Sequence, residues 1–89
     1  MNYFMIVFTE IGKRQREAVQ AGRYEASNAW TVTEDHWDRC FKGVSYREGL
    51  AAFQATMAHV AALEILTQEE RAVYEEASRL AEELWPQEA

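Results

Sequence analysis

The sequence predicts a small α+β protein, in which a two-stranded N-terminal sheet packs on a C-terminal antiparallel helical hairpin and helix dominates overall. Three observations lead to this class: a continuous apolar run at 3–8, an uncharged stretch at 49–63 and a strongly acidic segment after it. Eighty-nine residues are enough for one domain and not for two, so residues 1–89 are expected to share one core.

The two strands are predicted at about 2–10 and 29–32. The first contains an aromatic and β-branched run, YFMIVF, which is typical of a strand covered on both faces. One strand alone has no pairing partner, so the segment AWTV is predicted as the second. The intervening residues 11–25 show no clean period, and both a short helix and a hairpin arm remain open for them.

Three helices are predicted after the first strand, at about 34–42, 46–65 and 68–85. Thr33 is the expected N-cap of the first helix. Ser45 with Glu48, and Thr67 with Glu70, fit the capping box, in which a hydroxyl and a carboxylate three residues apart satisfy each other's backbone amides. Because the connection between the last two helices is short, they are predicted to form an antiparallel hairpin.

The predicted helix at 46–65 carries two apolar stripes. Its core stripe contains Leu50, Phe53, Met57, Val60 and Ala61. The second stripe, of small residues that let another backbone approach closely, contains Ala51, Ala55, Ala58 and Ala62. Two interpretations remain open. Either the last helix and the N-terminal strands cover both stripes, or the alanine stripe is a self-association surface buried by a second copy or another protein.

The last helix is strongly acidic. Residues 67–89 contain seven acidic and two basic residues, which is most of the net charge of −6. Three glutamates recur every seven residues and form one predicted partner-binding row, Glu69, Glu76 and Glu83. Trp85 is a candidate anchor at the rim of that surface, or a cap on the core. Glu75 and Arg79 are spaced for a helical ion pair, and Arg79 is also within reach of Glu82 and Glu83, so the alternative is that the acidic segment is an ordinary solvated helix face.

A basic segment lies near the N-terminus and is the only argument for nucleic-acid contact. Its residues are Lys13, Arg14, Arg16 and Arg23. They can touch phosphates, but the isoelectric point of about 4.8 argues against a nucleic-acid-binding domain. The alternatives are that these residues form a solvated loop, or that they pair with acidic groups of the same fold or of a second copy.

No pattern for catalysis or for a metal site is complete. His36 and Cys40 are four apart on a predicted helix, but two ligands are too few for zinc. A carboxylate cluster in the same region consists of Glu34, Asp35 and Asp38. Carboxylates in a first helical turn already have a structural reason to be there. The sequence therefore predicts neither an enzyme nor a cofactor or metal.

The sequence also predicts a cytoplasmic protein without a membrane segment. Cys40 is the only cysteine and cannot form an internal disulfide, and Met1 opens directly onto the apolar run without a basic leader. That run is too short to cross a bilayer.

Together these features predict a small acidic protein-binding module, an inhibitor or regulator that docks its acidic helix on a basic protein surface. The alanine stripe is the candidate surface for homodimerisation, and the oligomeric state is left open. The alternatives are a dimeric nucleic-acid-binding regulator that uses residues 13–23, and a structural or assembly subunit. In general character the chain is similar to many small proteins of phages and mobile elements, among them inhibitors of bacterial defence systems.

Overall fold

The computed structural model describes residues 2–86, and within them every regular element is an α-helix. The elements are α1 (Tyr3–Gln20), α2 (Tyr24–Cys40), α3 (Tyr46–Ala61) and α4 (Gln68–Glu83). The predicted α+β class is therefore wrong, because no strand or sheet occurs in the described part of the chain.

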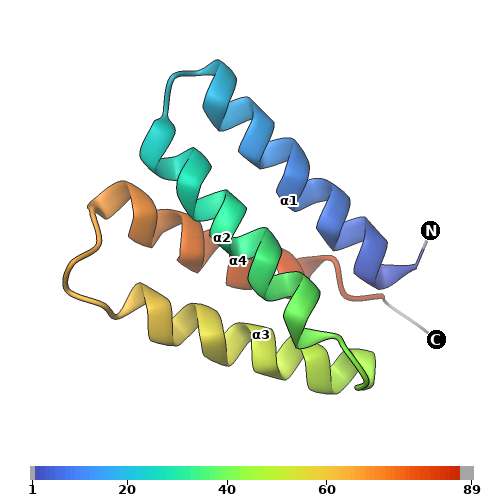
Figure 1. The fold of residues 1–89 in the computed structure, drawn as a ribbon. Helices are drawn as coiled ribbons and strands as arrows, with labels where there is room; N and C mark the ends of the chain where they lie inside the picture. Colours follow the sequence, from blue (N-terminus) through green and yellow to red (C-terminus); the bar gives the residue numbers. More distant parts are fainter. Residues whose placement is uncertain (1, 87–89) are drawn as a thin grey trace.

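The four helices form two antiparallel hairpins that pack against each other (Figure 1). The first hairpin is α1 and α2, and the second is α3 and α4, which confirms the predicted C-terminal helical hairpin. Helix α2 is the central element, since it contacts α1 on one side and both α4 and α3 on the other. This arrangement leaves α3 with neighbours on its inner side only.

The predicted strand at 2–10 is the first half of α1. Its N-cap is Asn2, whose side chain accepts a hydrogen bond from the Met5 amide at 2.9 Å. Tyr3, Val7 and Ile11 are four apart and buried on one side, whereas Met5 is 40% exposed. Every residue from 3 to 8 is apolar, so the run itself shows no helical period. The helical spacing of the buried residues becomes visible only when Ile11 is included with Tyr3 and Val7.

The predicted strand at 29–32 and the predicted helix at 34–42 are both parts of α2. Thr33 is not an N-cap but a fully buried residue in the middle of α2, and its hydroxyl donates to the Ala29 carbonyl at 2.8 Å. The buried residues of α2 recur every three or four positions, which is the pattern of a helix rather than a strand.

The open segment 11–25 contains the end of α1 and the start of α2. Gly22 has φ +74°, a backbone conformation that glycine adopts without strain. The Gly22 amide donates to the Val19 carbonyl and the Arg23 amide to the Ala18 carbonyl, the two hydrogen bonds of a Schellman motif. The chain therefore reverses here into α2 instead of forming a hairpin arm.

Both predicted capping boxes are confirmed. In each, the hydroxyl of Ser45 or Thr67 accepts from the backbone amide three residues on, and the glutamate there accepts in return. Helix α3 ends at Ala61, earlier than the predicted position 65. The Arg71 guanidinium donates to the Ala61 and Leu63 carbonyls at 2.8 and 2.7 Å, which satisfies carbonyls that a helix end leaves without a partner.

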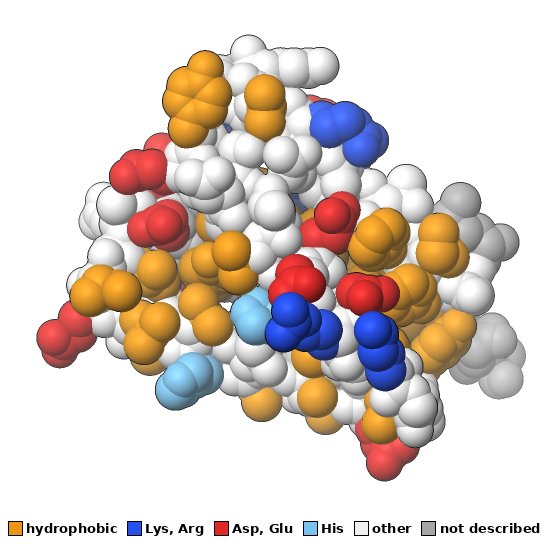
Figure 2. Space-filling model, viewed as in Figure 1, with side chains coloured by type: hydrophobic (Ala, Val, Ile, Leu, Met, Phe, Trp, Pro, Cys, Tyr) orange, Lys and Arg blue, Asp and Glu red, His pale blue; other side chains and the backbone are white. Residues whose placement is uncertain are grey.

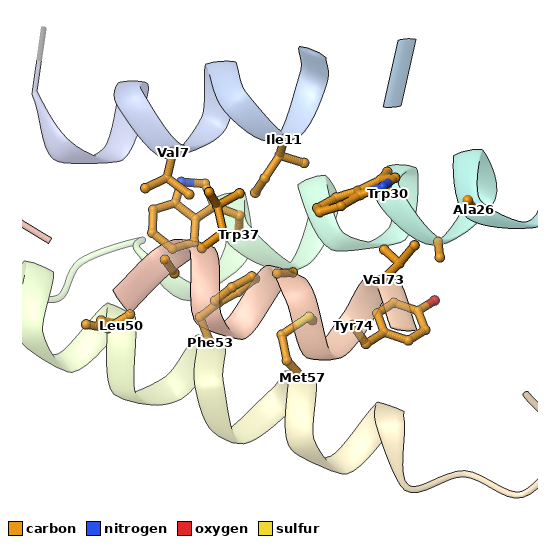
Figure 3. Packing of buried hydrophobic residues seen from close by; sticks show 14 of the residues in the cluster. Val7, Ile11, Ala26, Trp30, Trp37, Leu50, Phe53, Met57, Val73 and Tyr74 are labelled. Carbon is orange, nitrogen blue, oxygen red and sulfur yellow. The ribbon is translucent and has the colours of Figure 1, made fainter. Parts of the chain in front are cut away.

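The core is centred on Trp37, which is fully buried between the two hairpins (Figure 3). Its ring meets Phe53 edge to face, with ring centres 4.9 Å apart. Its indole Nε1 donates to the Phe4 carbonyl at 3.1 Å, so the polar atom is satisfied as well. The other large and fully buried side chains are Phe53, Ile11, Met57, Val7 and Thr33.

Two buried tyrosines make the fold sensitive to alkaline pH. The Tyr3 hydroxyl donates to the Ala81 carbonyl at 2.6 Å. Burial, and secondarily the Glu82 carboxylate, raises the pKa of Tyr3 above its ordinary value. Burial, and secondarily Glu70, also raises the pKa of Tyr74. Both phenols are therefore held neutral by folding.

We expect the free energy of unfolding to fall as the pH rises above about 10, the ordinary tyrosine pKa. A raised folded-state pKa stabilises the protein below that pH, because the unfolded chain loses its phenolic protons first. Thermal unfolding measured between about pH 8 and about pH 11 checks this. The Tyr3→Phe variant should lose less stability over that range than the wild type, and an equal loss in both would contradict the assignment to Tyr3.

Candidate functional site

The outer face of α3 is open to solvent in the described structure. All four residues of the alanine stripe are exposed: Ala51, Ala55, Ala58 and Ala62. Ala52 and His59 are exposed beside them, while Leu50, Phe53 and Met57 are buried on the opposite side. The expectation that the fold covers both apolar stripes of this helix is wrong, because α1 is a helix that packs on α2 and no described segment lies over the alanines.

A shallow groove runs beside this face, between α3 and α4. Its volume is about 390 Å³, and half of its lining side chains are small. The lining residues are Met57, Ala58, Ala61 and Ala62 from α3, and Tyr74, Glu75, Ser78 and Arg79 from α4. A second hollow of about 270 Å³ shares Ser78 and Arg79 with the first and adds Gln54, Glu82 and Glu83. The two hollows make one continuous surface, which we call the α3–α4 groove.

All charge in the α3–α4 groove comes from α4. Glu82 accepts a hydrogen bond from the Gln54 side chain at 3.0 Å. Glu75 and Arg79 are spaced for an ion pair with each other, but the pair is not formed. The ion pairs among residues 2–86 involve only the cations of Arg14, Arg23, Arg39 and Lys42, so Glu75, Arg79 and Glu83 are left without one.

The predicted acidic row does not form one free surface. Glu76 forms an ion pair with Arg14, and Glu69 lies 3.5 Å from the Arg23 guanidinium. Only Glu83 of the row lines the α3–α4 groove. The row and the basic segment, which the sequence presented as two candidate surfaces, therefore meet where α4 contacts α1 and the N-cap of α2.

Arg14 is the centre of that contact. Besides Glu76 it pairs with Glu10, at 3.1 Å from Nε to Oε2, and its guanidinium lies 5.8 Å from the centre of the Trp30 ring. Of the basic segment, Lys13 and Arg16 remain exposed and outside these ion pairs. Half of the candidate nucleic-acid contacts are thus neutralised by glutamates of the same chain.

Trp85 lies at the edge of the core and is partly buried. Its ring meets that of Tyr3 edge to face, with centres 4.9 Å apart, and the Arg47 guanidinium lies 4.6 Å from the Trp85 ring centre. One side of the indole packs on the core and a cation covers another part of it. This position is that of a cap on the core.

Exposed hydrophobic residues lie at the α3–α4 loop, and of these Ile65 was not predicted from the sequence. Figure 2 shows hydrophobic side chains gathered at the end of the molecule where this loop lies. Ile65, within the loop, is 89% exposed, and Leu63 is 39% exposed. Leu63 and Leu66 already signal such a surface in the sequence, because they fall on the side of the predicted helix away from its core stripe. Ile65 was not predicted because the helix was expected to continue to residue 65, whereas α3 ends at Ala61.

The cluster of Glu34, Asp35 and Asp38 does not converge on one point. Asp35 and Asp38 pair with cations one turn on, Arg39 at 3.0 Å and Lys42 at 3.9 Å. No group of three or more potential metal ligands was found within residues 2–86. Cys40 is half-buried, and burial raises the pKa of its thiol, so the reactive thiolate is disfavoured.

Comparisons with protein-family models, with curated proteins and with solved structures each find no match to this chain. Within residues 2–86, the helices all fall short of the length and apolarity that a membrane span requires. The fold and the site define an all-α protein with an uncharged, solvent-exposed helix face.

Proposed function

We propose that this protein is a protein-binding module, an inhibitor or regulator that acts by covering a surface of another polypeptide. The observation that supports the proposal is the exposed outer face of α3. Exposed contiguous apolar surface generally marks a binding site, and alanines allow a second helix to approach closely. Leu63 and Ile65 extend the same apolar surface into the loop.

We further propose that acidic residues of α4, the helix next to this face, contact a basic surface of the partner. Glu75 and Glu83 are exposed there and have no ion pair within residues 2–86. With a net charge of −6, the protein attracts basic surfaces during encounter and repels nucleic acid. The pairing of Arg14 with Glu76 and of Arg23 with Glu69 argues against the nucleic-acid alternative, which we do not propose.

The proposal is tested by photo-cross-linking from the α3 face. A photoreactive residue at Ala55 is expected to give a discrete cross-linked product in cells that contain the protein. Adding Ala58→Arg should lower the yield of that product at least about tenfold, because a long charged side chain then stands between the surfaces.

The matched control is Asn28→Arg, which places the same side chain at an exposed position of α2. This variant should leave the yield unchanged, and circular dichroism should show the same helical content for both variants. Equal yields from Ala58→Arg and Asn28→Arg would refute α3 as the contact surface.

A further inference from the structure

We propose that a hollow enclosed by α1, α2 and α4 binds a free amino acid with an apolar side chain. The hollow has a volume of about 460 Å³, and its most buried lining residues, Ala18, Trp30 and Val73, form the floor. We call it the α1–α4 hollow. Among the described residues it shares none with the α3–α4 groove, so the proposal goes beyond the protein-binding function and stands or falls separately from it.

The α1–α4 hollow exists because α1 and α4 each pack on α2 and have few direct contacts with each other. The two helices meet where the Tyr3 hydroxyl donates to the Ala81 carbonyl, and the ion pair of Arg14 with Glu76 bridges them further along. The volume falls within the range of about 300–1,000 Å³ that is usual for small-molecule sites. The space therefore suits one small molecule rather than a polypeptide segment.

The floor of the hollow carries a hydrogen-bond donor without a partner. The Trp30 side chain is only 4% exposed, and its indole Nε1–H has no hydrogen-bond partner within residues 2–86. No side-chain nitrogen or oxygen of these residues is both fully enclosed and unpaired, so Nε1 is open to the hollow that Trp30 lines. An indole N–H donates and cannot accept, so the ligand atom that meets it is an acceptor.

The cations near this donor favour a carboxylate as the acceptor. Figure 3 shows the Trp30 nitrogen at the end of the ring nearer Ala26, and Arg23, the N-cap of α2, lies one turn before Ala26. Arg23 lines the hollow and is 58% exposed; only its Nε is near Glu69, at 3.5 Å, so its other N–H groups can still donate. A carboxylate that accepts from an indole N–H and a guanidinium forms charge-assisted hydrogen bonds, which are stronger than neutral ones.

A positive group on the ligand is favoured by Glu17. Lys13 and Glu17 both line the hollow, are exposed and have no ion pair in the described part of the chain. They are one turn apart on α1, but lysine before glutamate is the less favourable order for a helical pair. Glu17 and the net charge of −6 repel a ligand that is only anionic, such as a phosphate or a fatty acid. An ammonium group next to the ligand carboxylate is attracted to Glu17 instead, and an amino acid carries both groups on one carbon.

The uncharged part of the lining favours an apolar ligand side chain. Besides Ala18 and Val73 on the floor, Ala21 and Ala72 line the hollow. A polar ligand side chain placed against these residues would lose its hydration without gaining a hydrogen bond. We therefore choose L-leucine as the probe.

The test follows the indole Nε1–H signal of Trp30 by proton–nitrogen correlation NMR while L-leucine is added to the full chain. Sequence-specific assignment separates the signals of the three tryptophans. The Trp30 signal is expected to shift and to saturate. Trp37 is the internal control, because its Nε1–H already donates to the Phe4 carbonyl and its signal should stay in place. A Trp30 signal that does not move with leucine at up to about 10 mM overturns the proposal.

Two analogues of leucine test its two charges. Isoamylamine lacks the carboxylate and should bind at least about tenfold more weakly, since it offers no acceptor to Trp30. Isocaproate lacks the ammonium group and should bind at least about threefold more weakly, since it leaves Glu17 facing an anion. If isoamylamine binds as tightly as leucine, the carboxylate assignment is wrong. If isocaproate does, the hollow takes carboxylates in general and the amino-acid assignment is wrong.

Variants of the lining residues connect these preferences to the hollow. Arg23→Gln and Glu17→Gln should each weaken leucine binding at least about threefold, and Glu17→Gln should also remove the preference for leucine over isocaproate. The matched control is Arg16→Gln, at an exposed position of α1 outside the hollow, which changes the net charge as Arg23→Gln does. It should leave binding unchanged. Equal weakening by Arg16→Gln and Arg23→Gln would mean that net charge governs binding, and would overturn the site. None of these outcomes alters the cross-link expected from Ala55, which tests the protein-binding function alone.

Discussion

Replacing Trp37 with alanine is expected to lower the free energy of unfolding by about 3–5 kcal/mol, the usual cost of removing a large buried aromatic side chain. Trp37 is fully buried and lies between the hairpins, in contact with Phe41 and Phe53. The substitution also leaves the Phe4 carbonyl without its donor. A domain of this size is stable by roughly 5–15 kcal/mol, so the variant should be largely or partly unfolded at 37 °C.

Urea denaturation followed by circular dichroism measures this loss, and Tyr24→Ala is the matched control. Tyr24 is an aromatic residue of the same helix but is 68% exposed, so its removal should change stability by no more than about 0.5 kcal/mol. Similar losses for the two variants would mean that α2 is not the central helix of the core.

Replacing Gly49 with alanine is expected to destabilise the protein by about 1–2 kcal/mol, although alanine is the better helix former. A Cβ at this position would lie 2.4 Å from Cδ1 of Phe41, far inside normal contact. The Phe41 ring cannot retreat easily, because its centre is only 4.2 Å from that of Trp37 and it also contacts Phe4. The overpacking therefore outweighs the gain of about 1 kcal/mol in helix propensity.

Gly12→Ala is the comparison that separates the two effects. Gly12 is also buried and inside a helix, but the nearest atoms to its Cβ would be the ends of the Arg16 and Glu34 side chains, both at 3.4 Å. These ends can move, so this variant should gain about 0.5–1 kcal/mol. Thermal and urea unfolding of both variants give the difference. A stabilised Gly49→Ala variant would contradict the close packing of Phe41 on α3.

Structural features that depend on a few neighbouring residues could be predicted from the sequence, and features that depend on distant contacts could not. The starts of α3 and α4 were predicted because a capping box is complete within four residues. The strands at 2–10 and 29–32 were wrong because aromatic and β-branched residues have a preference for strands that packing overrides. In α1, the choice between periods of two and 3.6 depended on Ile11, which lies outside the apolar run.

The sequence shows which residues belong to the candidate surfaces. It does not show which of these residues form ion pairs with one another. The alanine stripe is visible in the sequence, and the structure places all of it on the exposed side of α3. The acidic row and the basic segment are equally visible, but nothing local indicates that Arg14 and Arg23 reach Glu76 and Glu69, more than 40 positions away.

The sequence by itself determined the helix starts at Ser45 and Thr67, the hairpin of α3 and α4, and the uncharged composition of α3. These follow from contacts between residues a few positions apart, where the chain has little freedom. Only the tertiary structure decided that the N-terminal half is helical, that two of the three row glutamates are neutralised, and that the alanines face solvent. Those outcomes depend on which surfaces α2 buries, since burial of apolar area is not directional and is settled by the packing of the whole chain.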